Sequence, residues 1–187
     1  TPVYTPYAMS DISLQEAVAE WCSDSATAET TYGHIKCWDT SAVTDMSNLI
    51  YTHCGTSGSS FTRSTFNEDL SLWDTSRVTT MKYMFQYASA FNSDVSSWDV
   101  SRVENMAYMF LDAPSFNSDV SAWNVSSVTT MQQMFNGASS FNSDVSSWDV
   151  SRVETMAFMF FFASDFNSDV SSWTVSRVET MAGMFEY

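Results

Sequence analysis

Basic side chains are scarce in this sequence. Its 187 residues include 7 lysines and arginines against 22 aspartates and glutamates, which gives a formal net charge of −15. A nucleic-acid backbone or an anionic lipid surface binds through clustered positive charge, so the shortage argues against both as partners. No apolar run approaches the roughly 20 residues that cross a bilayer, so we expect no direct membrane insertion.

Cysteine and histidine are also rare. There are 3 cysteines and 2 histidines, no CxxC pair, and no cluster of these residues with the spacing of a zinc site. The sequence therefore predicts neither a metal centre nor a cofactor. No charged-then-apolar leader precedes Thr1, and a start at threonine indicates processing or truncation, of which a removed signal peptide is one form.

What the sequence does contain is a repeat of constant length. The same phrase begins at Phe66, Phe91, Phe116, Phe141 and Phe166, always 25 residues apart. A period of this length is typical of a chain that winds into stacked coils. We therefore predict a solenoid over residues 35–187, with a degenerate first repeat at 35–65 that contains a surface loop at 52–65. Five regular repeats follow at 66–187, the last of them incomplete.

The first 34 residues lie outside the repeat. Ser13-Leu-Gln-Glu16 has the form of a capping box, and apolar residues follow at helical spacing. We expect a lead-in and a helix that covers the open apolar end of the first coil, because terminal repeats of such proteins are usually atypical.

One repeat predicts one coil of the solenoid. Val95, Trp98 and Val100 have the LxxLxL spacing of a short strand, which would pair in parallel with its copies about 4.8 Å away. Ser101-Arg-Val-Glu104 resembles the N-terminus of a helix. The expected fold is thus an α/β repeat solenoid, a right-handed leucine-rich-repeat-like coil with short parallel strands on one face and short helices on the other. Repeated methionines and tryptophans are expected in its core, beside a buried ladder formed by Asn67, Asn92, Asn117, Asn142 and Asn167.

The phrase FNxDxSxWDxSxVxxMxxMFxxA, as it stands in these repeats, resembles the 25-residue repeat of BspA-like leucine-rich-repeat surface proteins, which include mycoplasma-type surface lipoproteins. The resemblance covers residues 35–187. It implies a secreted or cell-surface chain that mediates adhesion or interaction, without a common ligand. The long loop and the absence of a lipobox cysteine or wall-anchor motif depart from that pattern.

Three cysteines in a secreted chain predict one disulfide and one other thiol. Cys37 precedes Trp38 at a repeat position that we expect to face outward. The candidate disulfide is therefore Cys22 with Cys54.

Carboxylates recur at fixed repeat positions. One such column is a candidate acidic face on the solvent side of the strands: Asp74, Asp99, Asn124 and Asp149. Stacked copies share one environment, whereas acid–base catalysis needs two carboxyls in different environments, so we expect no catalytic residues and no enzyme. A divalent-cation-dependent module that binds Ca²⁺ along this column is the alternative function. An enzyme acting on polysaccharide is a distant one.

Side chains vary between copies on the expected helix side. Several are aromatic or apolar where solvent is expected, which marks a surface for association. The candidate interaction surface consists of Tyr83, Tyr108, Leu111, Phe158, Phe161 and Phe162. These positions could equally be buried against adjacent coils. We predict a non-enzymatic structural or adhesive module whose partners are proteins, cell-surface glycans or neighbouring subunits.

One glycosylation sequon occurs in the chain, Asn124-Val125-Ser126. It coincides with the one regular repeat in which a serine, Ser127, replaces the arginine that follows the acidic column. Loss of the acid and the base together indicates that the two positions are electrostatically coupled.

Overall fold

Helices are confined to the N-terminal part of the chain in the computed structural model, which describes residues 6–55 and 62–186. They are α1 (Asp11–Ser23), α2 (Ser25–Tyr32), the 3₁₀-helix η1 (Ile35–Cys37) and the short α3 (Leu49–His53). The helix expected from Ser13 is present and buries the predicted apolar stripe. Its N-cap is Ser10, three residues before Ser13, and these two serines exchange hydrogen bonds. The expected loop at 52–65 includes residues 56–61, which lie outside the described residues.

Helix α1 takes the place that a preceding coil would occupy. In coil after coil, one backbone N–H at the same repeat position donates to the coil before it, as Thr79 N does to Thr44 O at 2.8 Å. In the first coil the corresponding N–H, that of Thr44, donates instead to the Asp11 carboxylate at 2.7 Å. Tyr7 and Met9 bond to the backbone of Asp39 and so cover another part of this coil. The N-terminal segment thus supplies hydrogen-bond partners for the backbone groups at the open end of the first coil.

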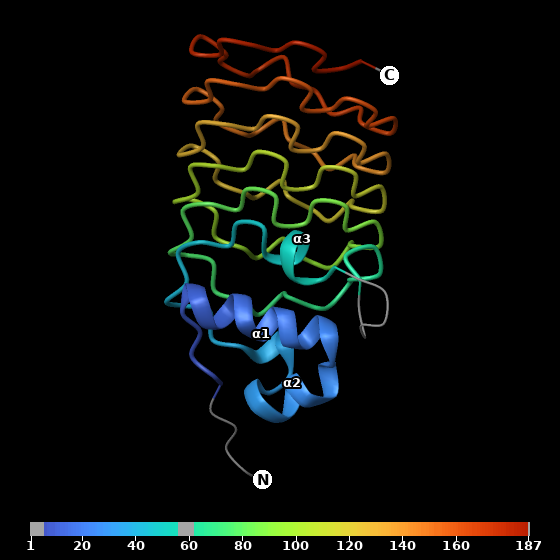
Figure 1. Cartoon of the computed structure of the whole chain (residues 1–187). Helices are drawn as coiled ribbons and strands as arrows, with labels where there is room; N and C mark the ends of the chain where they lie inside the picture. Colours follow the sequence, from blue (N-terminus) through green and yellow to red (C-terminus); the bar gives the residue numbers. More distant parts are fainter. Residues whose placement is uncertain (1–5, 56–61, 187) are drawn as a thin grey trace.

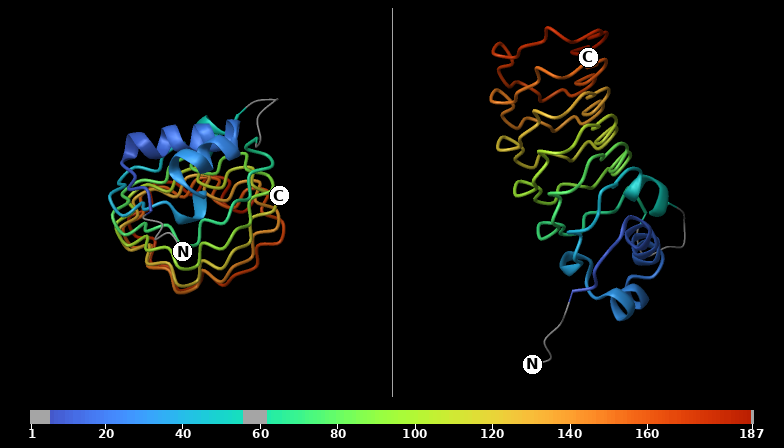
Figure 2. Two further views of the ribbon diagram at one scale, coloured as in Figure 1. Left: turned by 90° about the horizontal axis from the view of Figure 1, so that it is seen from below. Right: turned by 90° about the vertical axis from the view of Figure 1, so that its left-hand side faces the viewer.

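The rest of the chain forms coils that stack in sequence order, from α1 and α2 at one end to the C-terminus at the other (Figure 1). Seen along the stack, the coils follow similar closed paths around a common interior (Figure 2). We number them coil 1 (residues 35–65) and coils 2 to 6, which begin at Phe66, Phe91, Phe116, Phe141 and Phe166. Successive coils are joined by single parallel bridges, such as Thr80 to Asn105 and Asn105 to Thr130.

The predicted α/β architecture is wrong. Within residues 6–55 and 62–186 there is no β-strand and no sheet, and coils 2 to 6 contain no helix. Their residues lie in turns and extended links, with one bridge residue for each coil junction. The leucine-rich-repeat-like solenoid of parallel strands and outer helices is therefore not what this sequence forms.

Two consecutive turns replace the expected strand. Trp98 N donates to Val95 O at 3.2 Å, and Val103 N donates to Val100 O at 2.9 Å. The second turn occupies the segment predicted as a helix start, so Ser101-Arg-Val-Glu104 initiates no helix. We call this part of each coil, residues 94–103 and their equivalents 69–78, 119–128, 144–153 and 169–178, the turn face.

Left-handed residues replace the expected helix. Tyr83 and Tyr87 have φ of 59° and 61°, and their equivalents in the next coils are also left-handed. An α-helix cannot continue through such residues, since its hydrogen bonds require right-handed backbone throughout. The N–H groups turn toward the next coil instead: Tyr83 N donates to Ala107 O at 3.1 Å and Tyr87 N to Leu111 O at 2.8 Å. We call this part, residues 82–87 and their equivalents 107–112, 132–137, 157–162 and 182–186, the ridge.

Stacked aromatic rings fill the interior between the turn face and the ridge. Phe110 and Phe116 lie on opposite sides of one coil junction with ring centroids 3.7 Å apart, and Phe110 stacks on Phe135 of the next coil at 5.7 Å. Each repeat tryptophan is buried and donates its indole N–H to a backbone carbonyl of the preceding coil, as Trp98 does to Leu70 at 3.1 Å. The prediction of a methionine- and tryptophan-rich core is confirmed.

The asparagine column does connect successive coils, although it is exposed rather than buried. Asn92 N donates to Asn67 Oδ1 at 2.8 Å, and Asn117 N donates to Asn92 Oδ1 at 2.7 Å. The same bond recurs at the next two junctions. Each side-chain amide oxygen thus replaces a backbone acceptor, which ties the coils together at a corner where the backbones do not bond directly.

Candidate functional site

The ridge exposes side chains because its backbone, rather than its side chains, makes the contacts between coils. Every second ridge residue donates its N–H to the following coil, so the side chains have no part in that hydrogen bonding. Left-handed backbone is rare for residues other than glycine, and such residues gather at functional sites. The ridge holds seven of them: Tyr83, Tyr87, Tyr108, Asp112, Gln133, Phe158 and Phe162.

A tyrosine cluster occupies the ridge of coils 2 and 3 and the adjoining helix α3 of coil 1. Tyr83 stacks on Tyr108 of the next coil with centroids 4.6 Å apart, and Tyr51 lies 6.2 Å from Tyr83 and 5.9 Å from Tyr87. Tyr87 is 40% exposed and the other three rings are half-buried. Two of the seven basic side chains of the chain lie against this cluster. They are Arg63, 4.9 Å from the Tyr51 centroid, and Lys82, 4.9 Å from the Tyr83 centroid.

A phenylalanine cluster occupies the ridge of coil 5. Phe161 lies 5.5 Å from Phe158 and 4.1 Å from Phe162, centroid to centroid. Phe162 is 54% exposed, and the other two rings are half-buried. The Phe158 ring lies directly over Gly183 of coil 6, where a Cβ would collide with it. The absence of a side chain at Gly183 therefore leaves the space that this ring occupies.

A polar coil separates the two clusters. Coil 4 presents Gln133 and Asn136, whose side chains share a hydrogen bond of 3.0 Å. Leu111 is buried at 8% exposure, so it does not belong to the surface predicted for it. Tyr87 and Tyr51 do belong, and sequence reasoning missed them. Tyr87 occupies the same repeat position as Phe162, which is the signal that would have identified it.

On the turn face, the acidic side chains accept hydrogen bonds from nearby backbone N–H groups. In the predicted acidic column, each side-chain oxygen accepts the N–H of the serine two residues later: Asp74 at 2.9 Å, Asp99 at 2.9 Å, Asn124 at 3.2 Å and Asp149 at 3.0 Å. All four residues are exposed. A second column makes the same turn, for example Asp119 to Ser121 at 2.9 Å. These acids close turns, and apart from Asp69, which also pairs with Lys36, each column repeats one environment.

Hydrogen bonding lowers the pKa of these carboxyls. The Ser101 side chain, followed by its backbone N–H, holds the pKa of Asp99 below its usual value, and Asp74 and Asp149 are lowered by their own serines in the same way. Lys36 is the first cause that lowers the pKa of Asp69 to about 2. That lysine and Asp69 form the one ion pair found among the described residues, so no arginine is ion-paired with the acidic column there. The charge of Arg102 nevertheless adds to the lowering of the Asp99 pKa by Ser101.

No candidate metal site is assembled in residues 6–55 and 62–186, since no three histidine, cysteine or acidic side chains come together there. Ca²⁺ binds six to eight oxygens in an irregular cage. A row of single carboxylates, each committed to a serine N–H, fits such a cage poorly. The described part of the chain also has no helix long and apolar enough to cross a membrane.

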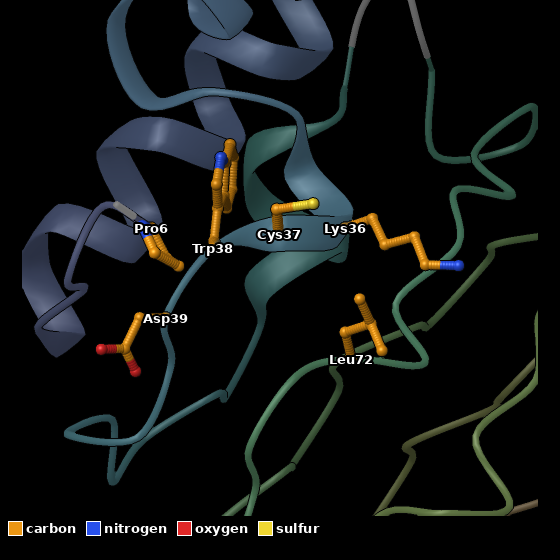
Figure 3. A pocket seen from close by; sticks show the side chains of 6 residues that line it. All are labelled: Pro6, Lys36, Cys37, Trp38, Asp39 and Leu72. Carbon is orange, nitrogen blue, oxygen red and sulfur yellow. The ribbon is translucent and has the colours of Figure 1, made fainter. Parts of the chain in front are cut away.

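A disulfide joins Cys22 of α1 to Cys54 beyond α3, whereas Cys37 is free and exposed. Cys37 lines a shallow hollow of about 530 Å³ at the N-terminal end, together with Pro6, Lys36, Trp38, Asp39 and Leu72 (Figure 3). Lys36 is paired with Asp69, and the Asp39 carboxylate accepts the Ser41 N–H at 3.0 Å. The charged groups of this hollow are thus already engaged. Cys37 also borders a second hollow, which Glu29, Gly33 and His34 line.

Comparison with known families assigns the repeat. The family described as "Mycoplasma protein of unknown function, DUF285" matches residues 18–129 and 115–187. The two matches together include the C-terminal part of α1, both cysteines of the disulfide and all six coils. The chain belongs to this family. The mycoplasma-type repeat suggested by the motif is therefore established. The description of the family names no ligand and no activity.

No curated protein and no solved structure matches the chain significantly. The geometry of the ridge and the turn face thus carries the functional argument alone.

Proposed function

We propose that this DUF285 chain is a non-enzymatic contact module of a secreted or cell-surface protein, of the BspA-like adhesive type, and that the ridge is its binding surface. Its partner is a protein, a cell-surface glycan or a neighbouring subunit. The observation that carries the proposal is the pair of aromatic clusters held on left-handed backbone. The Cys22–Cys54 disulfide supports the compartment, because disulfides persist in oxidising surroundings.

The ridge suits binding better than the turn face for a physical reason. Partly exposed aromatic rings bury apolar area on contact, at roughly 25 cal/mol per Å². Covering Phe161 and Phe162 would contribute about 2 kcal/mol before association costs are subtracted. The turn-face acids already accept hydrogen bonds from serine N–H groups and are exposed to water. To bind a partner they would have to give up some of these bonds.

The test compares one variant on each face. Phe161→Ser with Phe162→Ser removes two rings of the phenylalanine cluster, and Asp99→Asn with Asp149→Asn is the matched control that keeps the turn acceptors. Each protein is measured for self-association by light scattering and for binding on arrays of surface glycans and matrix proteins. We expect the ridge variant to lose association or binding and the control to retain it, with equal far-UV and near-UV circular dichroism.

Two outcomes would overturn the proposal. One is a native protein that stays monomeric at all concentrations and binds nothing on the arrays. The other is a ridge variant that associates and binds as well as the native chain, in which case the ridge has no role as a contact surface.

A further inference from the structure

The turn face of coil 4 differs from its neighbours at one place. Its column residue is Asn124 rather than aspartate, and the residue three positions later is Ser127 rather than arginine. Ala122 stands where Ser97 and Ser147 of the adjacent coils each donate a hydroxyl to the preceding coil. At these three positions coil 4 thus has small, uncharged side chains, although Asp119 of the same turn face is charged.

Asn124 is arranged with its nitrogen as the free end of the side chain. Its Oδ1 accepts two hydrogen bonds from Ser126, one from the backbone N–H at 3.2 Å and one from the hydroxyl at 2.7 Å. Its Nδ2 takes part in no hydrogen bond within the described residues. The residue is exposed, so this nitrogen is accessible to solvent.

The surroundings leave space for a bulky group. Ser127 turns back against the preceding coil, because its hydroxyl donates to Ser101 O at 2.6 Å. In coils 3 and 5 the same position carries Arg102 and Arg152, long side chains that are exposed. The shorter serine therefore clears the surface beside Asn124.

From these observations we propose that Asn124 is an N-glycosylation site. Asn124-Val125-Ser126 is the one Asn-x-Ser/Thr sequence in the chain, and its middle residue is not proline. In the reaction, Nδ2 forms a bond to the anomeric carbon of a lipid-pyrophosphate-linked oligosaccharide. The bond from that carbon to the pyrophosphate breaks, the lipid pyrophosphate leaves with the electron pair, and one amide proton is lost. The proposal shares with the proposed function an exported chain, but it requires no binding by the ridge.

The neighbouring coils supply the matched variants. Asn124→Asp installs the residue found at this position in coils 2, 3 and 5, and so keeps an acceptor for the Ser126 N–H while removing the amide. Ser126→Ala leaves the asparagine but removes the hydroxyl that the sequon requires, whereas Ser126→Thr preserves the sequon.

The full chain, fused to a signal peptide, is translated in the presence of endoplasmic-reticulum microsomes together with a known glycoprotein as a positive control. We expect one mass increment in the native chain and in Ser126→Thr, removed by an amidase that converts the glycosylated asparagine to aspartate. We expect none in Asn124→Asp or Ser126→Ala. The ridge variant Phe161→Ser with Phe162→Ser should be modified like the native chain, which separates this result from the proposed function.

A native chain that stays unmodified while the control glycoprotein is modified would overturn the proposal. A second measurement tests the structural argument. The modified chain, purified from a secreting eukaryotic cell, should unfold at the same temperature as its enzymatically deglycosylated form, since the sugar would project from an exposed turn. A markedly lower temperature for the glycosylated form would contradict the open space beside Ser127.

Discussion

The turn face and the ridge are two sides of the same coil, and they differ in which groups form the hydrogen bonds. Side chains take part on the turn face, whereas only backbone groups bond between coils on the ridge. On the turn face and at the asparagine corner just before it, side chains bond to backbone: Asp99 accepts from Ser101 N, and Asn92 Oδ1 accepts from Asn117 N. On the ridge, backbone bonds to backbone, as Phe110 N does to Met134 O at 2.9 Å. A side chain that accepts a backbone hydrogen bond cannot be replaced without losing that bond. A side chain with no such role is free to vary. The half-buried and exposed positions of the ridge therefore vary between coils, whereas its buried pair, such as Met109 and Phe110, is the same in every regular coil.

The largest expected effect comes from the core that joins the two faces. Phe110 is fully buried and stacks on Phe116, Phe85 and Phe135. Phe110→Ala should lower the free energy of unfolding by about 3–5 kcal/mol, because it removes a ring and leaves a cavity that the flanking coils cannot close. Denaturant unfolding followed by tryptophan fluorescence measures the change.

The control for Phe110→Ala is Phe162→Ala on the ridge, where the ring is 54% exposed. It should cost less than about 1 kcal/mol. Equal losses for the two variants would show that the ridge rings belong to the core, and the comparison of the two faces would then fail.

A smaller effect should follow from closing the gap at Gly137 on the ridge. Gly137 has φ of 70°, and a Cβ there would meet the carboxylate of Asp112 and lie 3.3 Å from the Asp112 Cα. The left-handed backbone alone should make Gly137→Ala lower the free energy of unfolding by about 1–2 kcal/mol, and the contact with Asp112 should add to this loss. Denaturant unfolding measures the change. In the background of Asp112→Ala the cost should fall, since the side-chain contact is gone. An unchanged cost would assign the whole effect to the backbone.

At the asparagine corner beside the turn face, a single hydrogen bond should contribute less than this. Asn117 Oδ1 accepts the Asn142 N–H at 2.8 Å. Asn117→Ala removes that acceptor and should destabilise the chain by about 1 kcal/mol. Asn117→Asp keeps an acceptor at the same position and should lose less at neutral pH. If both variants were as stable as the native chain, water would replace this bond without cost, and the asparagine corner would not depend on its side chains.

The sequence alone was enough to predict the period, the stacking of equivalent residues and the composition of the core. Phe110, Trp98 and Met106 are buried at the repeat positions where their apolar character places them. Burial follows from hydrophobic periodicity, which a sequence displays directly.

The backbone within each coil could not be predicted in this way. Val95, Trp98 and Val100 have strand spacing, yet Asp94 and Asp99 bend the chain into turns by accepting serine N–H bonds. Aspartate and serine offer the backbone this local alternative to a strand or a helix. Left-handed tyrosine and phenylalanine are equally hard to foresee, since those residues avoid that conformation unless bonds between coils impose it. The candidate surface was therefore located on the correct segment, but on a predicted helix that does not exist.

The smallest expected effect is the pH dependence of one turn-face acid, Asp119. The Ser121 side chain, followed by its backbone N–H, lowers the pKa of this carboxyl in the folded chain. A lowered folded pKa means that the contribution to stability is complete above the unfolded pKa of about 4 and is lost as the pH falls through the folded value. Asp119→Asn retains an acceptor for Ser121 N but has no proton to bind.

We therefore expect the unfolding temperature of the native chain to fall more steeply than that of Asp119→Asn as the pH decreases from about 5 to about 2. The two curves should run parallel above about pH 5, where the carboxylate is ionised in both the folded and the unfolded chain. The exposure of Asp119 keeps the difference small, because water screens the charged form. A constant difference between the curves across the whole range would show that Ser121 bonds the protonated and ionised forms equally. The turn face would then hold its aspartates for their shape and not for their charge.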